Sequence, residues 1–481
     1  MQRVSYIAFT LFFLVFANCA PTTYQRTKDG IVVHIKQKND TPAHKIKLQV
    51  IDDKIIRVVA TADKNFSSEK SLIITPGLSL SEKFNVVDDG TFIILSTDSI
   101  DVSVSKKDGE IAFLNKDGSL ILQENSGGGK SFLPIEVEGT KGYTLRQIFE
   151  SPDDEAFYGL GQHQADDFNY KGKNESLYQY NTKVSVPFVV SNKNYGILWD
   201  NYSLSKFGDA RDYRQLDQFK LYDAEGKEGG LTATYTRKDN PAEKIVRTES
   251  VLNYEFLSDI KNLPEGFDIN NSTVVWKGEI ESPESGTYNF YLHYAGYVRV
   301  FFNNELVVKE RWRTAWNPNY YKFMVDLNAG EKTPLRVEWE PDGGTSHIAL
   351  KALSPVPAEE QNKLSLWSEM GNEIDYYFVA GSTMDDVISG YRTLTGKSQV
   401  MPKWAMGFWQ SRERYKTQHE LLENLTEFRK RQISIDNIVQ DWSYWPVDAW
   451  GSHDFDPERF PDPKGLVDSV HAMNAKIMIS V

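Results

Sequence analysis

Short apolar runs separated by polar turns make up the first part of the chain. Apolar residues recur largely with period two at 31–37, 44–52, 54–62, 91–97 and 99–106. Turn residues separate these runs, among them Asp29-Gly30, Asp89-Gly90, Asp108-Gly109 and Ser126-Gly-Gly-Gly129. Period-two alternation is typical of strands with one buried face. Short strands with regular turns between them are typical of a β-sandwich, so residues 24–227 are predicted to form one.

A second β-rich block extends from residue 228 to 366. Apolar residues alternate from Gly286 to Leu292 and again from Val298 to Phe302. The second run ends at Asn303-Asn304, a pair suited to a hairpin turn because asparagine tolerates left-handed backbone. The block is predicted to be a separate sandwich, with the first sandwich completed by about 367–400.

The apolar period changes near residue 380. Residues 382–396 are predicted to form a helix, and 401–409 a buried strand that ends at Trp409. Thr417 to Glu420 is a capping box that opens a second helix, and Asp462-Pro463 opens a third. Strands are predicted at 433–440 and 476–481, which makes the order βαβαβ. Such an order predicts parallel strands with right-handed crossovers.

The N-terminal segment has the pattern of an export signal. Tyr6 to Ala17 is apolar, too short for a membrane span of about 20 residues, and follows the basic start Met1-Gln-Arg3. The chain's single cysteine, Cys19, comes directly afterwards, which resembles a bacterial lipoprotein signal over residues 1–18. The resemblance implies a periplasmic or outer-membrane lipoprotein held to the membrane by a lipid on Cys19. The alternative is an ordinary cleaved signal with an incidental cysteine.

Composition excludes several other classes. The formal net charge is −13, from 54 Lys and Arg against 67 Asp and Glu, which argues against nucleic-acid partners because phosphates demand basic residues. One cysteine permits no intramolecular disulfide and no cysteine-based zinc site. The 61 aromatic side chains (11 Trp, 24 Tyr, 26 Phe) fit a large β core or sugar-stacking surfaces.

No sequence motif predicts a cofactor or a metal. Gly129-Lys130-Ser131 imitates the end of a phosphate-binding loop, but Glu124 stands where that motif needs its first glycine. The stretch is therefore predicted to be a flexible turn. Gly159-Leu-Gly161 lacks the third glycine of a dinucleotide-binding loop, and no HExxH occurs.

Several stretches together resemble glycoside hydrolase family 31. Glu155-Ala-Phe-Tyr-Gly-Leu-Gly-Gln162, Asn181-Thr182, Pro187 to Ser191 and Tyr195 to Asn201 resemble its N-terminal sandwich signature. Val439 to Trp445 and Phe455 to Pro463 resemble the start of its catalytic barrel. The form Gln-Asp-Trp-x-Tyr-Trp at 440–445 is similar to that of bacterial α-xylosidases, and residues 228–366 resemble a PA14 module.

The resemblance implies a multidomain fold of β plus α/β class. It consists of an N-terminal β-sandwich with an inserted PA14 β-sandwich, followed by a (β/α)₈ barrel at 401–481 that is expected to be truncated after three strands. PA14 modules often bind calcium through paired aspartates, whose place Tyr294-Ala-Gly-Tyr297 takes here. Calcium is therefore not expected in this module.

Asp441 is the principal candidate for contact with substrate. Polar residues at the carboxyl ends of barrel strands are usually functional, and the resemblance implies that Asp441 binds the non-reducing sugar. The alternative is a carboxylate that only organises the loop. Trp442 is expected to wall the space that C6 of glucose would fill, which favours xylose; its alternative role is loop packing.

Further aromatic residues are candidates for sugar stacking. Trp409 is expected to form the pocket floor or else to be plain core. Tyr444, Trp445 and Trp450 lie in the long loop and are candidates for stacking, with plain packing as the alternative. In the PA14-like block, Trp312 to Tyr321 is predicted to be an aromatic loop that contacts long substrates through Trp312 and Trp316.

The implied activity is release of terminal α-linked xylose from xyloglucan oligosaccharides with retention. Retaining enzymes need two carboxylates, and the resemblance puts both, as aspartates, on later barrel strands beyond Val481. The 481-residue chain alone is therefore expected to be inactive. The alternatives are an α-glucosidase of the same family and a non-catalytic, lipid-anchored glycan-binding protein.

Overall fold

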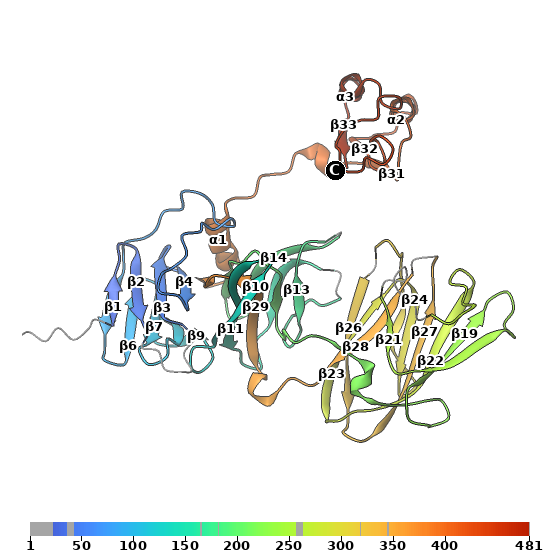
Figure 1. Ribbon diagram of the computed structural model, residues 1–481. Coiled ribbons are helices and arrows are strands. Elements are labelled where there is room, and N and C mark those ends of the chain that lie inside the picture. The colour runs from blue at the N-terminus through green and yellow to red at the C-terminus, as the bar shows by residue number, and fades with distance from the viewer. Residues whose placement is uncertain are drawn as a thin grey trace, which may run out of the picture. The chain divides into compact units, whose positions relative to one another are not determined.

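The computed structural model describes residues 23–35, 43–163, 166–180, 182–255, 263–317, 319–343 and 346–480. The chain forms two compact units, Met1–Gly396 and Lys397–Val481 (Figure 1). The predicted export signal and Cys19 lie outside the described residues. Within the described residues, no helix is long and apolar enough to cross a membrane.

The first sandwich is built from three antiparallel sheets. One sheet has the order β1 (Tyr24–Arg26), β2 (Gly30–His34), β3 (Lys45–Val50), β4 (Ile55–Thr61), β30 (Ile374–Ala380), β15 (Tyr195–Trp199), β14 (Val184–Ser191), β12 (Phe157–Gln162). The second has the order β5 (Asn85–Asp88), β6 (Phe92–Ser96), β7 (Ile100–Ser105), β8 (Ile111–Asn115), β9 (Leu120–Gln123). The third has the order β10 (Lys130–Val137), β11 (Thr140–Glu150), β29 (Lys363–Gly371), β16 (Ser205–Phe207), β13 (Glu175–Leu177).

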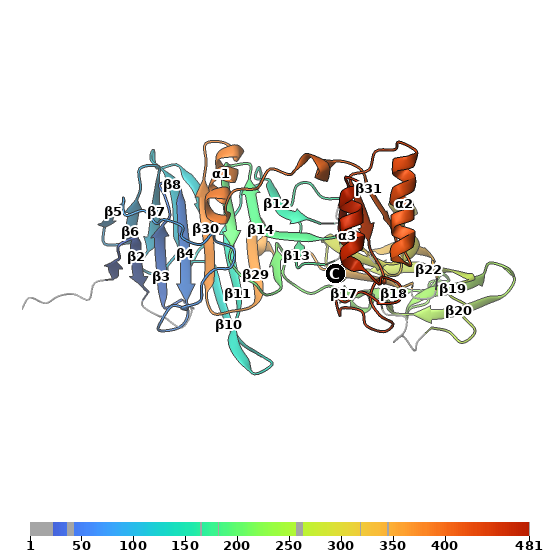
Figure 2. The same cartoon turned by 90° about the horizontal axis from the view of Figure 1, so that it is seen from above.

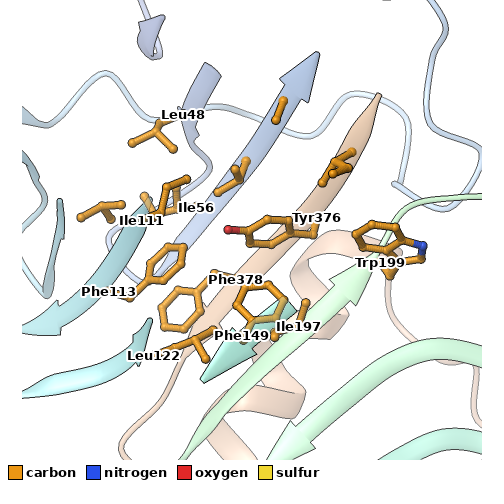
Figure 3. Packing of buried hydrophobic residues seen from close by; sticks show 14 of the residues in the cluster. Leu48, Ile56, Ile111, Phe113, Leu122, Phe149, Ile197, Trp199, Tyr376 and Phe378 are labelled. Carbon is orange, nitrogen blue, oxygen red and sulfur yellow. The ribbon is translucent and has the colours of Figure 1, made fainter. Parts of the chain in front are cut away.

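The facing sheets bury one continuous apolar core. Figure 3 shows side chains from β3, β4, β8, β9, β11, β15 and β30 meeting in it. Phe113 stacks on Phe378 with ring centroids 3.9 Å apart, and Phe149 meets Tyr376 edge to face at 5.4 Å. Every residue of β30 is buried. A strand buried on both faces shows as a continuous apolar run and not as an alternation.

Gly161, in the signature at 155–162, has to be glycine because the backbone of the neighbouring strand β14 lies against it. Its φ is +97°, and an added Cβ would lie 2.0 Å from the Val184 carbonyl oxygen. Only glycine accepts both this backbone conformation and this approach.

The prediction of a flexible turn at Gly129 to Ser131 is wrong, because Lys130 is a buried residue of a strand. It begins β10, and its ammonium group is buried against the Glu124 carboxylate. Lys130 Nζ also donates to the carbonyl oxygens of Gly109 and Gly128, both at 3.2 Å. Glu124 accepts from the Ile111 N–H and the Tyr376 hydroxyl, each at 2.9 Å. Burial raises the pKa of Glu124 and lowers the pKa of Lys130.

The second sandwich has two facing sheets. One contains β17 (Arg214–Gln215), β28 (Ile348–Leu353), β23 (Gly286–Tyr294) and β26 (Asn319–Leu327), with β21 (Leu252–Tyr254) paired to β28. The other contains β20 (Lys244–Glu249), β19 (Leu231–Arg237), β22 (Ser272–Glu281), β27 (Lys332–Glu340), β24 (Gly296–Phe302) and β25 (Glu305–Arg313), with β18 (Lys220–Tyr222) paired to β22. The turn between β24 and β25 is Asn303-Asn304, with φ of 51° and 64°.

The second sandwich interrupts the first. After β28 the chain returns as β29, between β11 and β16, and as β30, between β4 and β15. Three elements differ from the boundaries expected from sequence. β17 and β18 precede residue 228 yet pair with β28 and β22, and β29 rejoins the first sandwich from Lys363 onward.

Helices are few. Short 3₁₀ turns lie at Leu216–Gln218, Ala358–Glu360 and Lys403–Met406. Helix α1 (Met384–Thr395) follows the first sandwich, and Thr383 caps it by accepting from the Asp386 N–H. α1 buries Val387 and Leu394 in a cluster with Ile55, Phe188 and Val379.

The C-terminal unit alternates strands and helices. Its described residues form a parallel sheet with the order β31 (Trp409–Arg412), β32 (Asn437–Gln440), β33 (Lys476–Ile479). α2 (Gln418–Lys430) and α3 (Pro463–Ala472) pack side by side in this unit (Figure 2). Thr417 caps α2 by accepting from the Glu420 N–H, and Asp462 caps α3. The predicted βαβαβ order is confirmed.

Candidate functional site

β32 is the central strand of the parallel sheet, and all four of its residues are buried. The register pairs Gln440 with Arg412 of β31 and with Ile479 of β33. The carboxyl ends of the strands therefore lie at one edge. This edge of an α/β sheet is where ligands bind.

Asp441 follows directly on β32 at this edge and is half-buried. Among the described residues, none donates a hydrogen bond or forms an ion pair to its carboxylate. An ionised carboxylate has two oxygens that accept hydrogen bonds, so Asp441 can accept from two neighbouring hydroxyls of a ligand. The backbone after Asp441 is hydrogen-bonded to the residue that follows β31, because the Trp442 N–H donates to the Glu413 carbonyl oxygen at 2.8 Å.

Trp442 belongs to an aromatic group beside Asp441. Its ring lies edge to face with Trp450 at 4.2 Å and with Trp445 at 5.3 Å. Trp445 is buried, whereas Trp450 is 69% exposed. Trp442 thus packs against both rings and remains half-buried.

The aromatic residues of the long loop have different positions. Tyr444 is 2% exposed and packs against Phe455. Tyr444 and Trp445 are therefore core residues of this unit, which favours the packing alternative over sugar stacking for both. Trp450 alone of the three remains available.

The long loop is held by the Phe455 to Pro463 motif. Arg459 donates to the carbonyl oxygens of Ser443 and Trp445 at 2.7 and 2.6 Å. Asp456 accepts from the N–H groups of Glu458 and Arg459, and these hydrogen bonds with the charge of Arg459 lower the pKa of Asp456. Ser443 has φ +60°, a costly conformation for this residue, and Arg459 holds it there. The motif therefore has a structural role, because its side chains hold the backbone of the long loop.

Trp409 does not end the first barrel strand, as its sequence predicted, but begins it. Residues 401–406 are not a buried strand: Met401 and Met406 are 63% and 79% exposed, and Lys403–Met406 is a 3₁₀ turn. Trp409 pairs with Asn437 at the amino end of β32. With strands rising about 3.3 Å per residue, it lies a full strand away from Asp441.

The carboxyl end of β31 holds Arg412 instead, which the sequence pattern did not single out. Its guanidinium pairs with Glu420 at 3.1 Å and lies 5.5 Å from the centre of the Tyr415 ring. The alternation of apolar and polar residues from Trp409 to Arg412 does not show that Arg412 lies at this edge. Its position follows only from where β31 begins and ends.

Trp312 and Trp316 lie on the second sandwich, one in a strand and the other in a turn. Trp312 is in β25 and not in a loop, because β25 extends to Arg313. It is 45% exposed, donates to Asp342 at 2.8 Å, and lies 6.2 Å from the ring of Tyr297, which is 42% exposed. Trp316 is in the turn that follows and is 75% exposed. Trp312 and Tyr297 form an exposed aromatic pair.

The position at which PA14 modules often bind calcium is occupied by protein groups. Tyr294 is buried, and the Ala295 carbonyl oxygen accepts from the Trp339 indole at 2.7 Å. Across the described residues, no three His, Cys, Asp or Glu side chains come together as a metal site. The expected absence of a metal stays a prediction.

Three family models match the chain. Residues 45–207 match the glycosyl hydrolase 31 N-terminal galactose mutarotase-like domain, and 398–481 match the glycosyl hydrolases family 31 TIM-barrel domain. Residues 227–361 match the PA14 domain.

Relatives agree with these matches. The crystal structure of a family 31 α-xylosidase from Xanthomonas citri is 45% identical, with a TM-score of 0.87, over 95% of this chain and 49% of that one. An α-xylosidase from Saccharolobus solfataricus is 27% identical over 91% of this chain and 40% of its own length. A soil-metagenome α-xylosidase structure, at 20% identity and TM-score 0.56, shares the fold.

The chain spans about half the length of the Xanthomonas structure and less of the Saccharolobus relative. The two family 31 domains flank the PA14 domain along the chain. The sheet topology agrees, because β29 and β30, which follow the second sandwich, belong to sheets of the first. The chain thus belongs to glycoside hydrolase family 31 and carries a PA14 domain inserted in its N-terminal sandwich.

Proposed function

We propose that the complete protein is an α-xylosidase that releases terminal α-linked xylose from xyloglucan oligosaccharides. The observation that carries the proposal is the 45% identity to a family 31 α-xylosidase over 95% of this chain. The unengaged carboxylate of Asp441, at the carboxyl end of the central parallel strand, supports it independently.

The proposed reaction proceeds with retention. One carboxylate attacks the anomeric carbon and forms a covalent xylosyl intermediate, while a second protonates the departing oxygen and then activates water. Asp441 has neither role in this proposal. It accepts hydrogen bonds from xylose hydroxyls and orients the ring for attack, and Trp442 closes the space where the hydroxymethyl group of glucose would project.

The activity is tested with the complete gene product. Aryl α-D-xyloside and aryl α-D-glucoside are compared, and the anomer formed first from a xyloglucan oligosaccharide is followed by NMR. Faster hydrolysis of the xyloside with α-xylose as first product supports the proposal. Preference for the glucoside favours the α-glucosidase alternative, and hydrolysis of neither favours a glycan-binding protein.

Trp442→Ile tests the wall in the same complete protein. We expect the preference for aryl α-xyloside over aryl α-glucoside to fall roughly 10-fold or more, because filling or opening space for one carbon group changes discrimination by about 1–3 kcal/mol. Val447→Ala, in the same loop at an 84% exposed site, is the matched control. An unchanged ratio in Trp442→Ile contradicts the assignment.

Trp312→Ala and Trp316→Ala test whether the PA14 domain contacts long substrates. Both rings are exposed, and covering an aromatic ring with a sugar removes apolar area from water. We expect a loss in kcat/KM of roughly 5- to 10-fold on xyloglucan oligosaccharides and little change on aryl α-xyloside. Leu306→Ala, 46% exposed on the same strand as Trp312, is the control. Equal losses on both substrates refute the idea.

A further inference from the structure

A pocket of about 380 Å³ lies at the seam between the first sandwich and the PA14 domain. We call it the seam pocket. Its first wall comes from β13 and β16 and the segments that follow them, and its second from β23, β26 and β28. All its lining residues belong to the N-terminal unit. Seams between domains are common places for small-ligand sites, and the volume is within the usual range for them.

Tyrosines form the apolar part of the seam pocket. The rings of Tyr213 and Tyr291 are 5.0 Å apart, and those of Tyr291 and Tyr320 are stacked at 5.2 Å. Tyr178, 39% exposed, also lines the pocket. The three packed rings make a continuous row on the side of the second sandwich, whereas Tyr178 follows β13 of the first.

Buried hydrogen bonds keep this row in place. The Tyr320 hydroxyl donates to the buried Glu175 carboxylate, and the Tyr213 hydroxyl donates to Asn174 at 2.9 Å. The ammonium of Lys183 lies 3.9 Å from the centre of the Tyr320 ring. Burial raises the pKa of Tyr213, Tyr291 and Tyr320 well above the usual value, so the rings stay neutral at any physiological pH.

The charges that line the seam pocket cancel in pairs. The four pairs are Lys206–Asp212 at 3.0 Å, Arg211–Asp209 at 2.6 Å, Lys322–Glu175 at 3.5 Å and Lys351–Glu255 at 2.9 Å. Each of these four cations has its own carboxylate, so the residues that line the pocket carry no net charge. The paired groups still present oxygens and N–H groups for additional hydrogen bonds.

We propose that the seam pocket is a glycan-binding site that takes a neutral pyranose unit. A row of tyrosine rings beside paired polar groups suits a ligand that is uncharged, carries many hydroxyls and has apolar C–H faces. A β-1,4-linked glucose unit meets these requirements because its hydroxyls are equatorial. The choice of a glucan over other neutral glycans rests on the proposed function. The preference of the pocket for a neutral sugar rests on the pocket's own residues and is independent of that function.

The test uses cellotetraose, which contains no xylose, with the 481-residue chain and isothermal titration calorimetry. We expect saturable binding that weakens about 10-fold in Tyr178→Ala and in Tyr291→Ala, since one lost stacking contact corresponds to about that factor. Tyr291→Phe keeps the ring and should bind like the parent chain. Tyr202→Ala, at a 54% exposed tyrosine outside the pocket, is the matched control.

Each outcome decides the proposal. Absence of binding by the parent chain overturns it, as does binding that Tyr178→Ala and Tyr291→Ala leave unchanged. Binding lost only in Trp312→Ala or Trp316→Ala places the glycan on the exposed aromatic residues and also overturns it. Circular dichroism of Tyr291→Ala shows whether weaker binding reflects a lost contact or a lost fold. If Tyr291→Ala proves unstable, Tyr178→Ala, at an exposed position, decides the question.

Failure of the two proposals can be told apart. Cellotetraose binding by the seam pocket without xyloside hydrolysis by the complete protein leaves the glycan site standing and removes the α-xylosidase. Xyloside hydrolysis without cellotetraose binding supports the α-xylosidase and rules out the glycan site in the seam pocket.

Discussion

Asp441→Asn in the complete protein is expected to lower kcat/KM for aryl α-xyloside by roughly 100-fold or more. A hydrogen bond to a charged group contributes about 1.5–3 kcal/mol, and the Asp441 carboxylate has both oxygens unengaged by described protein groups. Loss of the charge and of one acceptor therefore costs about 3 kcal/mol, which corresponds to a factor of roughly 100. The amide has nearly the same shape, so the fold should be retained.

Asp448→Asn is the matched control for this variant. Asp448 lies seven positions further along the same loop, is exposed, and has φ +58°, a conformation that asparagine accepts well. Its activity should equal that of the parent protein. Equal activity of Asp441→Asn and the parent would show that Asp441 only organises its loop. A loss that appears on the aryl xyloside but spares longer substrates would also contradict a role in holding the terminal xylose.

Lys130→Met is expected to produce the largest loss of stability, about 3–5 kcal/mol. It removes the cation that faces the buried Glu124 and leaves the Gly109 and Gly128 carbonyl oxygens without their donor. For a domain of this size the sandwich transition in calorimetry should fall by about 6 °C or more. Lys28→Met, at the exposed pair with Glu82, is the control and should leave the transition unchanged.

The stability deficit of Lys130→Met should depend on pH. Burial raises the pKa of Glu124, so the folded state disfavours the charged carboxylate once its partner is gone. The deficit is then smallest below the unfolded pKa of about 4.3 and grows as pH rises through the folded pKa. The double variant Lys130→Met with Glu124→Leu should be more stable than Lys130→Met alone. A pH-independent deficit would contradict the buried pair as its cause.

Local signals in the sequence account for most of the secondary structure that was predicted correctly. The caps Thr417 and Asp462 accept the hydrogen bonds expected of them. Asn303-Asn304 forms its turn with both φ values positive. A cap or a tight turn depends on residues within about four positions of itself, so sequence spacing is enough to recognise it.

The candidate site was predictable only in part. Asp441 is at the predicted place because it directly follows a short apolar run that becomes β32. The prediction for Trp409 is wrong and Arg412 is not singled out by the sequence, because β31 begins at Trp409 and so places Arg412 at the carboxyl edge. Strand ends are weakly marked in sequence, because pairing with neighbouring strands sets them.

By itself, the sequence determined the two sandwiches, the change to alternating strands and helices, and the aspartate at the end of the second parallel strand. These follow from apolar period, caps and turns, which are local properties of the chain. Only the tertiary structure decided that Lys130 is a buried partner of Glu124, that Tyr444 and Trp445 are core, and that Tyr213, Tyr291 and Tyr320 share a pocket. In each case the deciding quantity is burial or a partner distant in sequence, and the fold alone brings such groups together.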